Sequence, residues 1–382
     1  MDYHVFLISF DDLCLYGRSM DGSMMKRDHG GNICEISRRY GIDEDKIIDF
    51  SASINPLDYP PRLKETIIKE FDFILNYPDI DSFDLVSGLS EYHGISRDYI
   101  LAGNGSTEFI YWIPILFKPE KALIVTPAFS EYEKGLKMVG TKVSYFQTDE
   151  KEDFSVDIAR LCKRLRDGFD IVYFCNPANP TGVLMSKENL CSIIACAQEA
   201  ETLFVIDEAF IDFAEQGSVK KEVLRFSNLI VLRSMTKFFA IPGLRIGYVI
   251  GSMPCIAKIR ETRPPWAVNS LGQKAAAAAL SDRDYIMDTR QYVTDEREFL
   301  MAALSEIPGL KTYKSVANFL LVFMDNRISL NSRELRDSLA KNGVLIRDCS
   351  TFQGMGDRYF RVAVKKHEQN MILVEKLKRV AK

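Results

Sequence analysis

The sequence predicts an α/β fold of three layers, with a mostly parallel sheet in a large domain and a second, smaller α+β domain. Short apolar runs alternate with stretches of helix length through the middle of the chain, and this alternation changes after about residue 280. The chain has 382 residues, of which 47% are hydrophobic, and this is enough for one large core and one smaller core.

Each expected strand of the large domain is a short apolar run that ends at polar or turn-forming residues. The runs expected as strands are residues 122–126, 143–146, 171–175, 203–206, 229–232 and 246–250. The stretches expected as helices between them include residues 130–139, 155–165 and 187–200. Strands that alternate with helices of this length form parallel βαβ units, so we expect a mostly parallel sheet with helices on its faces.

The C-terminal part has a different pattern. It contains a long charged helical stretch, followed by the expected elements 319–323, 332–341, 344–346, 359–364 and 368–380. We expect residues 285–382 to form the small α+β domain, joined by residues 29–57 from the other end of the chain, and residues 58–284 to form the large domain. Residues 1–28 are expected to be an N-terminal extension. They lack a positively charged leader and are a poor match to a signal peptide.

The composition argues against several classes of protein. The net charge is −4 and the sequence has no basic stripe, so we expect no nucleic-acid partner. No apolar run is long enough for a membrane helix. The eight cysteines form no Cys-x-x-Cys pair and only four histidines are present, so no metal site is expected. We interpret the cysteines within apolar segments as buried thiols of a cytoplasmic protein.

The most informative residue is Lys237, which follows the expected strand 229–232. The hydroxyls of Ser234 and Thr236 and the guanidinium of Arg245 flank it. A lysine amine forms a Schiff base with an aldehyde cofactor, and the flanking groups can hold a phosphate on that cofactor. A solvated surface lysine is the simple alternative. The Ser-x-x-Lys pattern also occurs in β-lactamases, but the Ser-Asp-Asn and Lys-Thr-Gly tripeptides of those enzymes are absent here.

Further polar residues follow other expected strands. Asp207 ends an apolar run, and its carboxylate can pair with the protonated ring nitrogen of pyridoxal phosphate (PLP) or simply cap a helix. Asn179 follows the strand 171–175 and can donate to the ring oxygen, whereas Asn176 fits a plain loop. Ligands of parallel sheets collect at the carboxyl ends of strands, so we expect Asn179, Asp207 and Lys237 to lie together.

Two more segments fit the same cofactor. The run Gly-Asn-Gly-Ser-Thr-Glu contains Gly105, Ser106 and Thr107 ahead of a helical stretch, and backbone amides at a helix N-terminus bind phosphate. The same letters also form ordinary turns. Phe129 can stack on the ring face of the cofactor, and packing alone is the rival interpretation.

From about His29 to the C-terminus, the chain resembles the fold-type I, aspartate-aminotransferase-like PLP enzymes. The motifs that carry the resemblance are Gly-x-Gly-Ser-Thr-Glu, Asn-Pro-Thr-Gly, Asp-Glu-Ala-Phe and Ser-x-Thr-Lys with Gly-x-Arg-x-Gly. The resemblance implies a Schiff base at Lys237, with Asp207 at the ring nitrogen and Asn179 at the ring oxygen. It implies a phosphate site formed by Gly105, Ser106, Thr107, Ser234, Thr236 and Arg245. It also implies a homodimer, in which Tyr77 reaches the cofactor phosphate of the neighbouring subunit.

Within that family, four segments resemble the threonine-phosphate decarboxylases of cobalamin side-chain synthesis. They lie at residues 29–32, 49–56, 207–213 and 265–269. This resemblance implies decarboxylation of L-threonine O-3-phosphate to (R)-1-aminopropan-2-yl phosphate. The substrate would be held by His29, Gly30, Arg347 and Arg361. The chain has Ser53 where those enzymes usually have an asparagine that contacts the substrate phosphate.

Two alternatives remain at this point. The first is an aminotransferase that acts on histidinol phosphate or another amino acid, in which Arg361 binds the substrate carboxylate. The second is a regulatory module that binds PLP without turnover. Such regulators carry a DNA-binding segment ahead of the enzyme-like part, and the residues before His29 are too few and too acidic for a winged helix.

Overall fold

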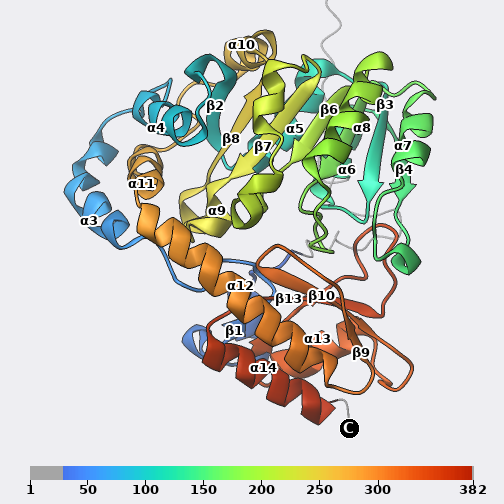
Figure 1. Cartoon of the computed structure of the whole chain (residues 1–382). Helices are drawn as coiled ribbons and strands as arrows, with labels where there is room; N and C mark the ends of the chain where they lie inside the picture. The colour runs from blue at the N-terminus through green and yellow to red at the C-terminus, as the bar shows by residue number, and fades with distance from the viewer. Residues whose placement is uncertain (1–28, 381–382) are drawn as a thin grey trace, which may run out of the picture.

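Two larger β-sheets and a small two-stranded sheet organise residues 29–380, the part of the chain that the computed structural model describes (Figure 1). The predicted extension, residues 1–28, lies outside the described residues. The larger sheet has seven strands in the order β2-β8-β7-β6-β5-β3-β4. These strands are β2 (Ile100–Asn104), β3 (Lys121–Thr126), β4 (Lys142–Gln147), β5 (Ile171–Cys175), β6 (Leu203–Asp207), β7 (Leu229–Ser234) and β8 (Ile246–Gly251).

The prediction of a mostly parallel sheet is confirmed. Strands β4, β3, β5, β6 and β7 run parallel to one another, and β8 runs antiparallel to both β7 and β2. All five residues of β5 are buried. Helices cover both faces of such a sheet, so a central strand such as β5 is apolar at every position and does not alternate.

The helices form the outer two layers. On one face lie α5 (Ser106–Phe117), α6 (Glu131–Met138) and α10 (Met253–Thr262). On the other face lie α4 (Phe83–His93), α7 (Ile158–Leu165), α8 (Lys187–Glu199) and α11 (Ser270–Leu280). Helix α7 begins three residues later than predicted because the Asp157 side chain accepts a hydrogen bond from the Arg160 amide and caps the helix there.

Strand β2 is missing from the prediction. Only its first three residues are apolar, and Gly103 and Asn104 are typical of turns. It forms the edge of the sheet by pairing antiparallel with β8, from Ile100 opposite Ile250 to Asn104 opposite Ile246. This pairing partner is about 150 residues away in sequence, so local pattern does not reveal it.

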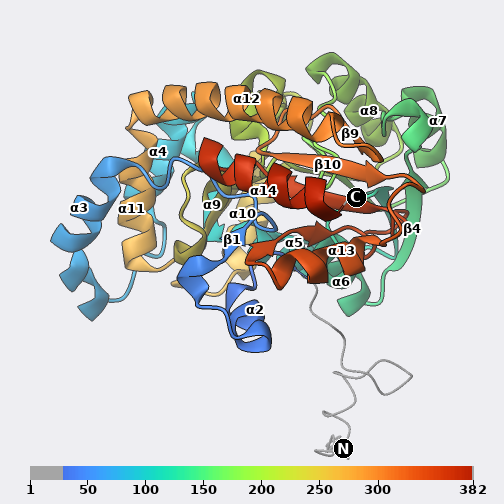
Figure 2. The same cartoon turned by 90° about the horizontal axis from the view of Figure 1, so that it is seen from below.

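The smaller sheet is antiparallel, with the strand order β12-β13-β10-β9. Its strands are β9 (Leu310–Thr312), β10 (Phe319–Met324), β12 (Arg347–Asp348) and β13 (Tyr359–Ala363). Figure 2 shows α12 (Arg283–Ser305), α13 (Ser332–Ala340) and α14 (His367–Val380) around it. The remaining helices are α2 (Ile33–Tyr40), α3 (Pro61–Lys69) and the short α9 (Met235–Phe238).

Residues from the N-terminal side join this smaller part. Strand β1 (Ile48–Asp49) pairs parallel with β11 (Val344–Leu345), and Phe50 is fully buried in the same core. Helix α12 contributes to both cores, with Val293 in the larger and Leu300 in the smaller. The domain boundaries given above remain a prediction.

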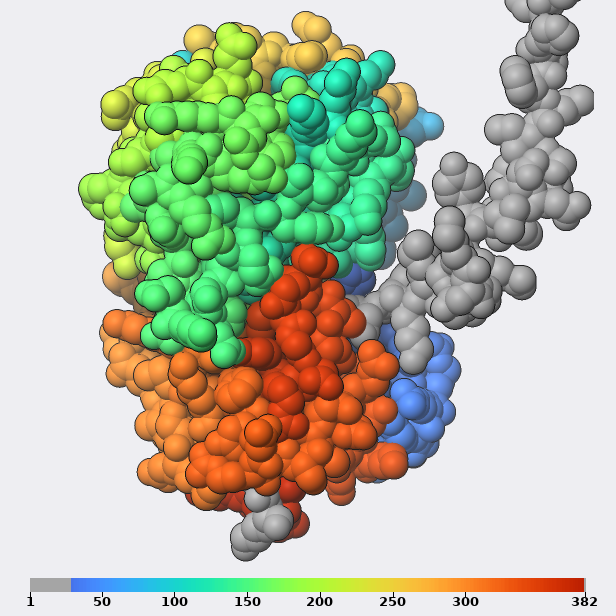
Figure 3. Space-filling view, turned by 90° about the vertical axis from the view of Figure 1, so that its right-hand side faces the viewer, coloured from blue at the N-terminus to red at the C-terminus, as the bar shows by residue number. Residues whose placement is uncertain are grey.

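The part of the molecule built on the seven-stranded sheet contacts the part built on the four-stranded sheet. Figure 3 shows this interface, where C-terminal residues lie directly against residues from the middle of the chain. The Phe154 ring lies 5.1 Å from that of Tyr313 and 6.1 Å from that of Tyr359. The side chain of Gln147 donates to the carbonyl oxygen of Gly354 at 3.3 Å. These contacts hold the two sheets in a fixed relation around the space between them.

Two of the eight cysteines form a pair that the sequence analysis does not predict. Cys162 on α7 and Cys196 on α8 form a disulfide across the outer layer of helices. They are 34 residues apart, and nothing in their spacing indicates the pairing. Among residues 29–380, no helix has the length and apolar character needed to cross a membrane.

Candidate active site

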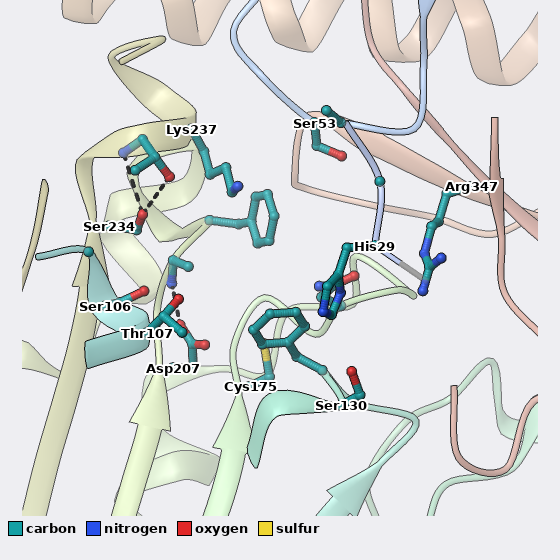
Figure 4. Close-up of a pocket in the computed structure, with 18 of the residues that line it drawn as sticks. His29, Ser53, Ser106, Thr107, Ser130, Cys175, Asp207, Ser234, Lys237 and Arg347 are labelled. Carbon is teal, nitrogen blue, oxygen red and sulfur yellow. Dashed lines mark hydrogen bonds between the residues drawn. The ribbon is translucent and has the colours of Figure 1, made fainter. Parts of the chain in front are cut away.

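A cavity of about 260 Å³ lies between the two parts, at the carboxyl ends of β5, β6 and β7 (Figure 4). Every site residue predicted from the sequence lines this cavity, except Tyr77. The lining includes His29, Gly30, Gly105, Ser106, Thr107, Phe129, Asn179, Asp207, Ser234, Thr236, Lys237, Arg245, Arg347 and Arg361. The structure therefore gathers in one place residues that are as much as 332 positions apart (361 − 29 = 332).

Lys237 lies in α9, directly after β7, with its side chain directed into the cavity. Burial, together with the charges of Arg361 and Arg245, lowers the pKa of its amine to about 8, and the charge of Asp207 acts in the opposite direction. Its carbonyl oxygen accepts a hydrogen bond from the Asn55 amide at 3.0 Å. A buried amine with this pKa is a far better nucleophile at neutral pH than a surface lysine.

Asp207 is the only carboxylate among the residues that line the cavity. One of its oxygens accepts a hydrogen bond from the Tyr132 hydroxyl at 2.6 Å, and the other accepts from the Ala209 amide at 2.9 Å. Burial raises the pKa of this carboxyl, whereas the hydrogen bond from Tyr132 lowers it. These contacts fix the carboxylate in place and leave its charge to be balanced by a cation in the cavity.

The predicted phosphate-binding residues surround the N-terminus of α5. Gly105 has φ +75°, a backbone conformation that favours glycine, and a Cβ there would lie 2.8 Å from Nη2 of Arg245, so a larger residue would displace this guanidinium. The hydroxyls of Ser234 and Thr236 lie 2.8 Å apart. Amides at a helix N-terminus, two hydroxyls and an arginine form a set that suits a phosphate dianion.

A buried arginine joins β7 to the segment that follows Asp207 at the end of β6. Arg233, on β7, has no exposed surface, and its guanidinium contacts Glu208 at 3.0 Å, Asp212 at 2.8 Å and Glu215 at 2.7 Å. The three carboxylates belong to the end of β6 and the loop that follows it. This ion-pair cluster therefore fixes the position of the segment after β6 relative to the end of β7, next to the cavity.

Arg347 and Arg361 lie directly opposite each other on β12 and β13. Like charges in that position repel. Arg361 donates to Ser51 O at 3.0 Å and also to Oδ1 of Asn179, and both of these partners are uncharged. Burial, with a contribution from the charge of Arg347, lowers the pKa of Arg361 to about 10. An anion between the two guanidinium groups would relieve the repulsion.

His29 lies at the edge of the cavity and is held by a residue that the sequence analysis did not identify. Its Nε2 is 3.0 Å from Glu131 Oε1, which also accepts from Lys134 Nζ at 2.6 Å. The hydrogen bond with His29, together with those from Lys134 and Tyr111, lowers the pKa of the Glu131 carboxyl to about 2. A Cβ on Gly30 would lie 2.3 Å from Ser51 O, so the chain beside His29 passes too close for any larger residue.

Tyr77 does not reach this cavity. It is 80% exposed, and its ring stacks on Trp266 at 4.7 Å. Phe129, whose packing role was the rival interpretation, lines the cavity with its ring 5.8 Å from that of His29 and 5.9 Å from that of Tyr132. Among residues 29–380, no group of three or more His, Cys, Asp or Glu residues is arranged to hold a metal ion.

Fold and cavity define a class of protein: an α/β enzyme with a buried lysine and a phosphate-binding loop at the carboxyl edge of a mostly parallel sheet. The family model for class I and II aminotransferases matches residues 45–377. The chain is also 36% identical to a threonine-phosphate decarboxylase from Salmonella typhimurium over 92% of this chain and 96% of the relative.

Two crystal structures of other proteins are similar to this chain over most of its length. One is a histidinol-phosphate aminotransferase from Clostridium acetobutylicum, with a TM-score of 0.81 and 32% identity over 87% of this chain and 98% of the other. The second is an L-threonine-O-3-phosphate decarboxylase from Porphyromonas gingivalis, with a TM-score of 0.76 and 25% identity over 86% and 98%.

The chain therefore belongs to the class I and II aminotransferase family of PLP-dependent enzymes. This confirms the predicted fold class, the resemblance that the sequence motifs indicate and PLP as the cofactor of the family. The roles of the individual residues remain predictions, and the cavity geometry is consistent with them.

The pKa of Lys237 leads to a first prediction. With a pKa of about 8, roughly one amine in ten is neutral at pH 7, compared with about three in ten thousand for an ordinary lysine. The rate of PLP capture by cofactor-free protein should therefore rise with pH and level off above a midpoint near 8. Borohydride trapping followed by peptide mapping should place the label on Lys237.

The matched control is Lys134→Ala, which removes the lysine of α6 that contacts Glu131 and should leave the labelled peptide unchanged. Lys237→Ala should bind PLP only reversibly. A label on any other lysine, or a midpoint above pH 10, would contradict the assignment.

Proposed function

We propose that the protein is a PLP-dependent decarboxylase of L-threonine O-3-phosphate, which forms (R)-1-aminopropan-2-yl phosphate for the cobalamin side chain. The observation that carries this proposal is the facing pair Arg347 and Arg361, with His29 beside the same cavity. Two guanidinium groups that come from paired positions and line the same cavity suit a doubly charged phosphate better than a singly charged carboxylate. The 36% identity to a threonine-phosphate decarboxylase supports the same substrate.

The residues of the cavity fit PLP. Ser106, Thr107, Ser234, Thr236 and Arg245 would hold its phosphate, and Asn179 and Phe129 would contact its ring. Asp207 would pair with the ring nitrogen. A positive charge at about 4 Å from this carboxylate, in an effective dielectric of 20, is favoured by roughly 4 kcal/mol, so Asp207 would keep the nitrogen protonated. When bound, PLP withdraws electrons from a bond at the substrate Cα that stands perpendicular to its ring.

The protein determines which bond at the substrate Cα stands perpendicular to the cofactor ring. If Arg347 and Arg361 hold the phosphate at the far end of the substrate, the carboxylate is left without an arginine and can turn out of the ring plane. The bond between Cα and the carboxylate then breaks and carbon dioxide leaves. Lys237, the only lysine among the residues that line the cavity, would supply the proton that Cα takes up.

Transamination is the second candidate, and the 32% identity to a histidinol-phosphate aminotransferase structure is the observation in its favour. In that case Arg361 would bind the carboxylate, and the hydrogen on Cα would be lost instead. The decarboxylase and the aminotransferase share the cofactor residues, so only the anion that Arg361 binds distinguishes them.

A second prediction tests the arginine pair. Arg347→Ala and Arg361→Ala should each lower kcat/KM for phosphothreonine by about 30- to 1000-fold, because each loses a charge-assisted contact of about 2–4 kcal/mol. Plain threonine should be a poor substrate of the parent enzyme. Arg327→Ala removes an exposed arginine from the same part of the chain and serves as the control.

The result to measure is carbon dioxide release from phosphothreonine in steady-state assays. Normal activity of the Arg361→Ala variant on phosphothreonine would rule out the proposed binding mode.

We also propose that the active protein is a homodimer. Residues 68–83 expose several large apolar side chains: Ile68, Phe71, Phe73, Ile74, Leu75, Tyr77, Ile80 and Phe83. A cluster of this kind is typical of an interface between chains. A second copy that covers it would bring Tyr77 towards the cofactor phosphate of its neighbour, as the family resemblance implies. Location in the cytoplasm remains a prediction from the sequence.

A third prediction follows from this shared site. Tyr77→Ala and Lys237→Ala should each be nearly inactive, and mixing them under conditions that exchange subunits should restore part of the activity. The heterodimer keeps one complete site, which contains Lys237 from one chain and Tyr77 from the other. Sedimentation should show a dimer at assay concentrations, and an active monomer would refute the proposal.

A further inference from the structure

A second cavity lies beside the active-site cavity and shares a wall with it. Its volume is also about 260 Å³. Its other walls come from α2, α13, β11 and β12, which belong to the smaller part of the molecule. A ligand bound there would lie next to the proposed substrate site without entering it. Four residues line both cavities: His29, Gly30, Ser51 and Arg347.

The second cavity carries an excess of positive charge. Four arginines and two carboxylates line it, which leaves an excess of two positive charges when the histidine is counted as neutral. The whole chain has a net charge of −4, so this excess is local. A cavity lined by one sign of charge concentrates ions of the opposite sign. The charged residues are Arg39, Arg333, Arg336, Arg347, Glu35 and Asp348.

Hydrogen bonds from uncharged groups hold both carboxylates in place. Asp348 accepts a hydrogen bond from Ser332 Oγ at 2.6 Å. It also accepts from the amide of Ser350 at 2.9 Å and from the hydroxyl of the same residue at 2.8 Å. Glu35 accepts from the side-chain amide of Asn32. The positions of these carboxylates therefore do not depend on the arginines of the cavity.

Two of the arginines make only long contacts with carboxylates of residues 29–380. The distance from Arg333 Nε to Asp348 Oδ2 is 3.9 Å, and that from Arg39 Nη2 to Asp337 Oδ2 is 3.7 Å. Both distances are too long for a hydrogen bond. The side chains of Arg39 and Arg333 are 49% and 59% exposed, so they have room to turn towards an anion in the cavity.

The arginines reach the cavity from three elements. Arg333 and Arg336 are three residues apart on α13 and therefore lie on one face of this helix. Arg39 comes from α2 and Arg347 from β12. The guanidinium of Arg336 is fixed by Asp337 Oδ1, which lies 3.0 Å from Nε and 2.9 Å from Nη2. Guanidinium groups on several sides of one cavity suit a phosphate, because each can donate to a different oxygen.

We propose that the second cavity binds a phosphate dianion, distinct from the phosphates of the cofactor and of the proposed substrate. Arg39 and Arg333 would be its principal ligands, because they line this cavity alone and have no carboxylate of residues 29–380 within hydrogen-bonding distance. Two sources supply this chemistry: inorganic phosphate, and the phosphate of a second phosphorylated amino acid. The proposal does not depend on which reaction the protein catalyses.

The test counts the phosphate ions bound per chain. Labelled inorganic phosphate is dialysed to equilibrium against the PLP-loaded parent and against the double variant Arg39→Ala/Arg333→Ala. The double variant should bind one ion fewer, because the loss of two charge-assisted contacts should weaken binding of that ion by about 30-fold or more. Identical binding by the two proteins would overturn the proposal.

A matched double variant controls for the general loss of positive charge. Arg38→Ala/Arg327→Ala removes two exposed arginines, one next to Arg39 on α2 and one from the same part of the molecule, and neither lines either cavity. It should bind as many ions as the parent. An equal loss in both double variants would show non-specific attraction only. Because Arg39 and Arg333 are half exposed, their removal should leave Tm unchanged.

Arg361→Ala separates the second cavity from the proposed substrate site, because Arg361 lines only the first cavity. The ion lost from Arg39→Ala/Arg333→Ala should be retained by this variant. A parent that binds a single ion, which either variant removes, would have only the first site and would overturn the proposal. If the proposed function fails and the first cavity holds no phosphate, the parent should still bind one ion and Arg361→Ala should keep it.

N-acetyl phosphothreonine identifies the source of the phosphate. Its blocked amine cannot react with the cofactor, whereas its phosphate is that of the amino acid. The second cavity is as large as the first, so we expect this compound to displace the labelled ion from the Arg361→Ala protein. Retention of the ion would show that the site takes inorganic phosphate alone, and either result supports the site.

Discussion

The arrangement of the molecule depends on an excess of positive charge in one cavity. Lys237, Arg245, Arg347 and Arg361 line it, and Asp207 is the only acidic residue among them. Burial makes this excess costly, and the lowered pKa values of Lys237 and Arg361 reflect that cost. Two phosphates, one on the cofactor and one on the substrate, would neutralise it. The cationic groups form two clusters, one around the N-terminus of α5 and one on β12 and β13, as two separate anions require.

The two clusters belong to different sheets, so their separation depends on how those sheets are joined. Residues 51–55 make that connection directly, because the backbone of Ser51 contacts Arg361 and the backbone of Asn55 contacts Lys237. Helix α12 packs into both cores and holds the same relation from outside. The distance between a substrate phosphate and the reacting carbon is thus set by the fold as a whole. This explains why a family with one cofactor site can carry out different reactions by changing what the second cluster binds.

Much of the large sheet and of the candidate site could be predicted from the sequence, because the strands and their polar ends leave a local pattern. Strands β5, β6 and β7 each begin with at least four consecutive apolar residues. Parallel strands bring their ends to one edge of the sheet, so Asn179, Asp207 and Lys237 could be placed together without a structure. What could not be predicted depends on contacts between distant residues: the edge strand β2, the Tyr132 hydroxyl on Asp207, the Glu131 carboxylate on His29 and the Cys162–Cys196 disulfide. None of these leaves a periodic signal, because each depends on side chains that meet only after folding.

The central claim is that the arginine pair holds the substrate by its phosphate and thereby directs the reaction to the carboxylate. The most direct measurement is the fate of carboxyl-labelled L-threonine O-3-phosphate, incubated with the PLP-loaded protein in the presence of 2-oxoglutarate. The account predicts that labelled carbon dioxide and 1-aminopropan-2-yl phosphate form in equal amounts, with little glutamate. Formation of glutamate with the label retained in the organic product would contradict it, because the bond to hydrogen would then be the one that breaks.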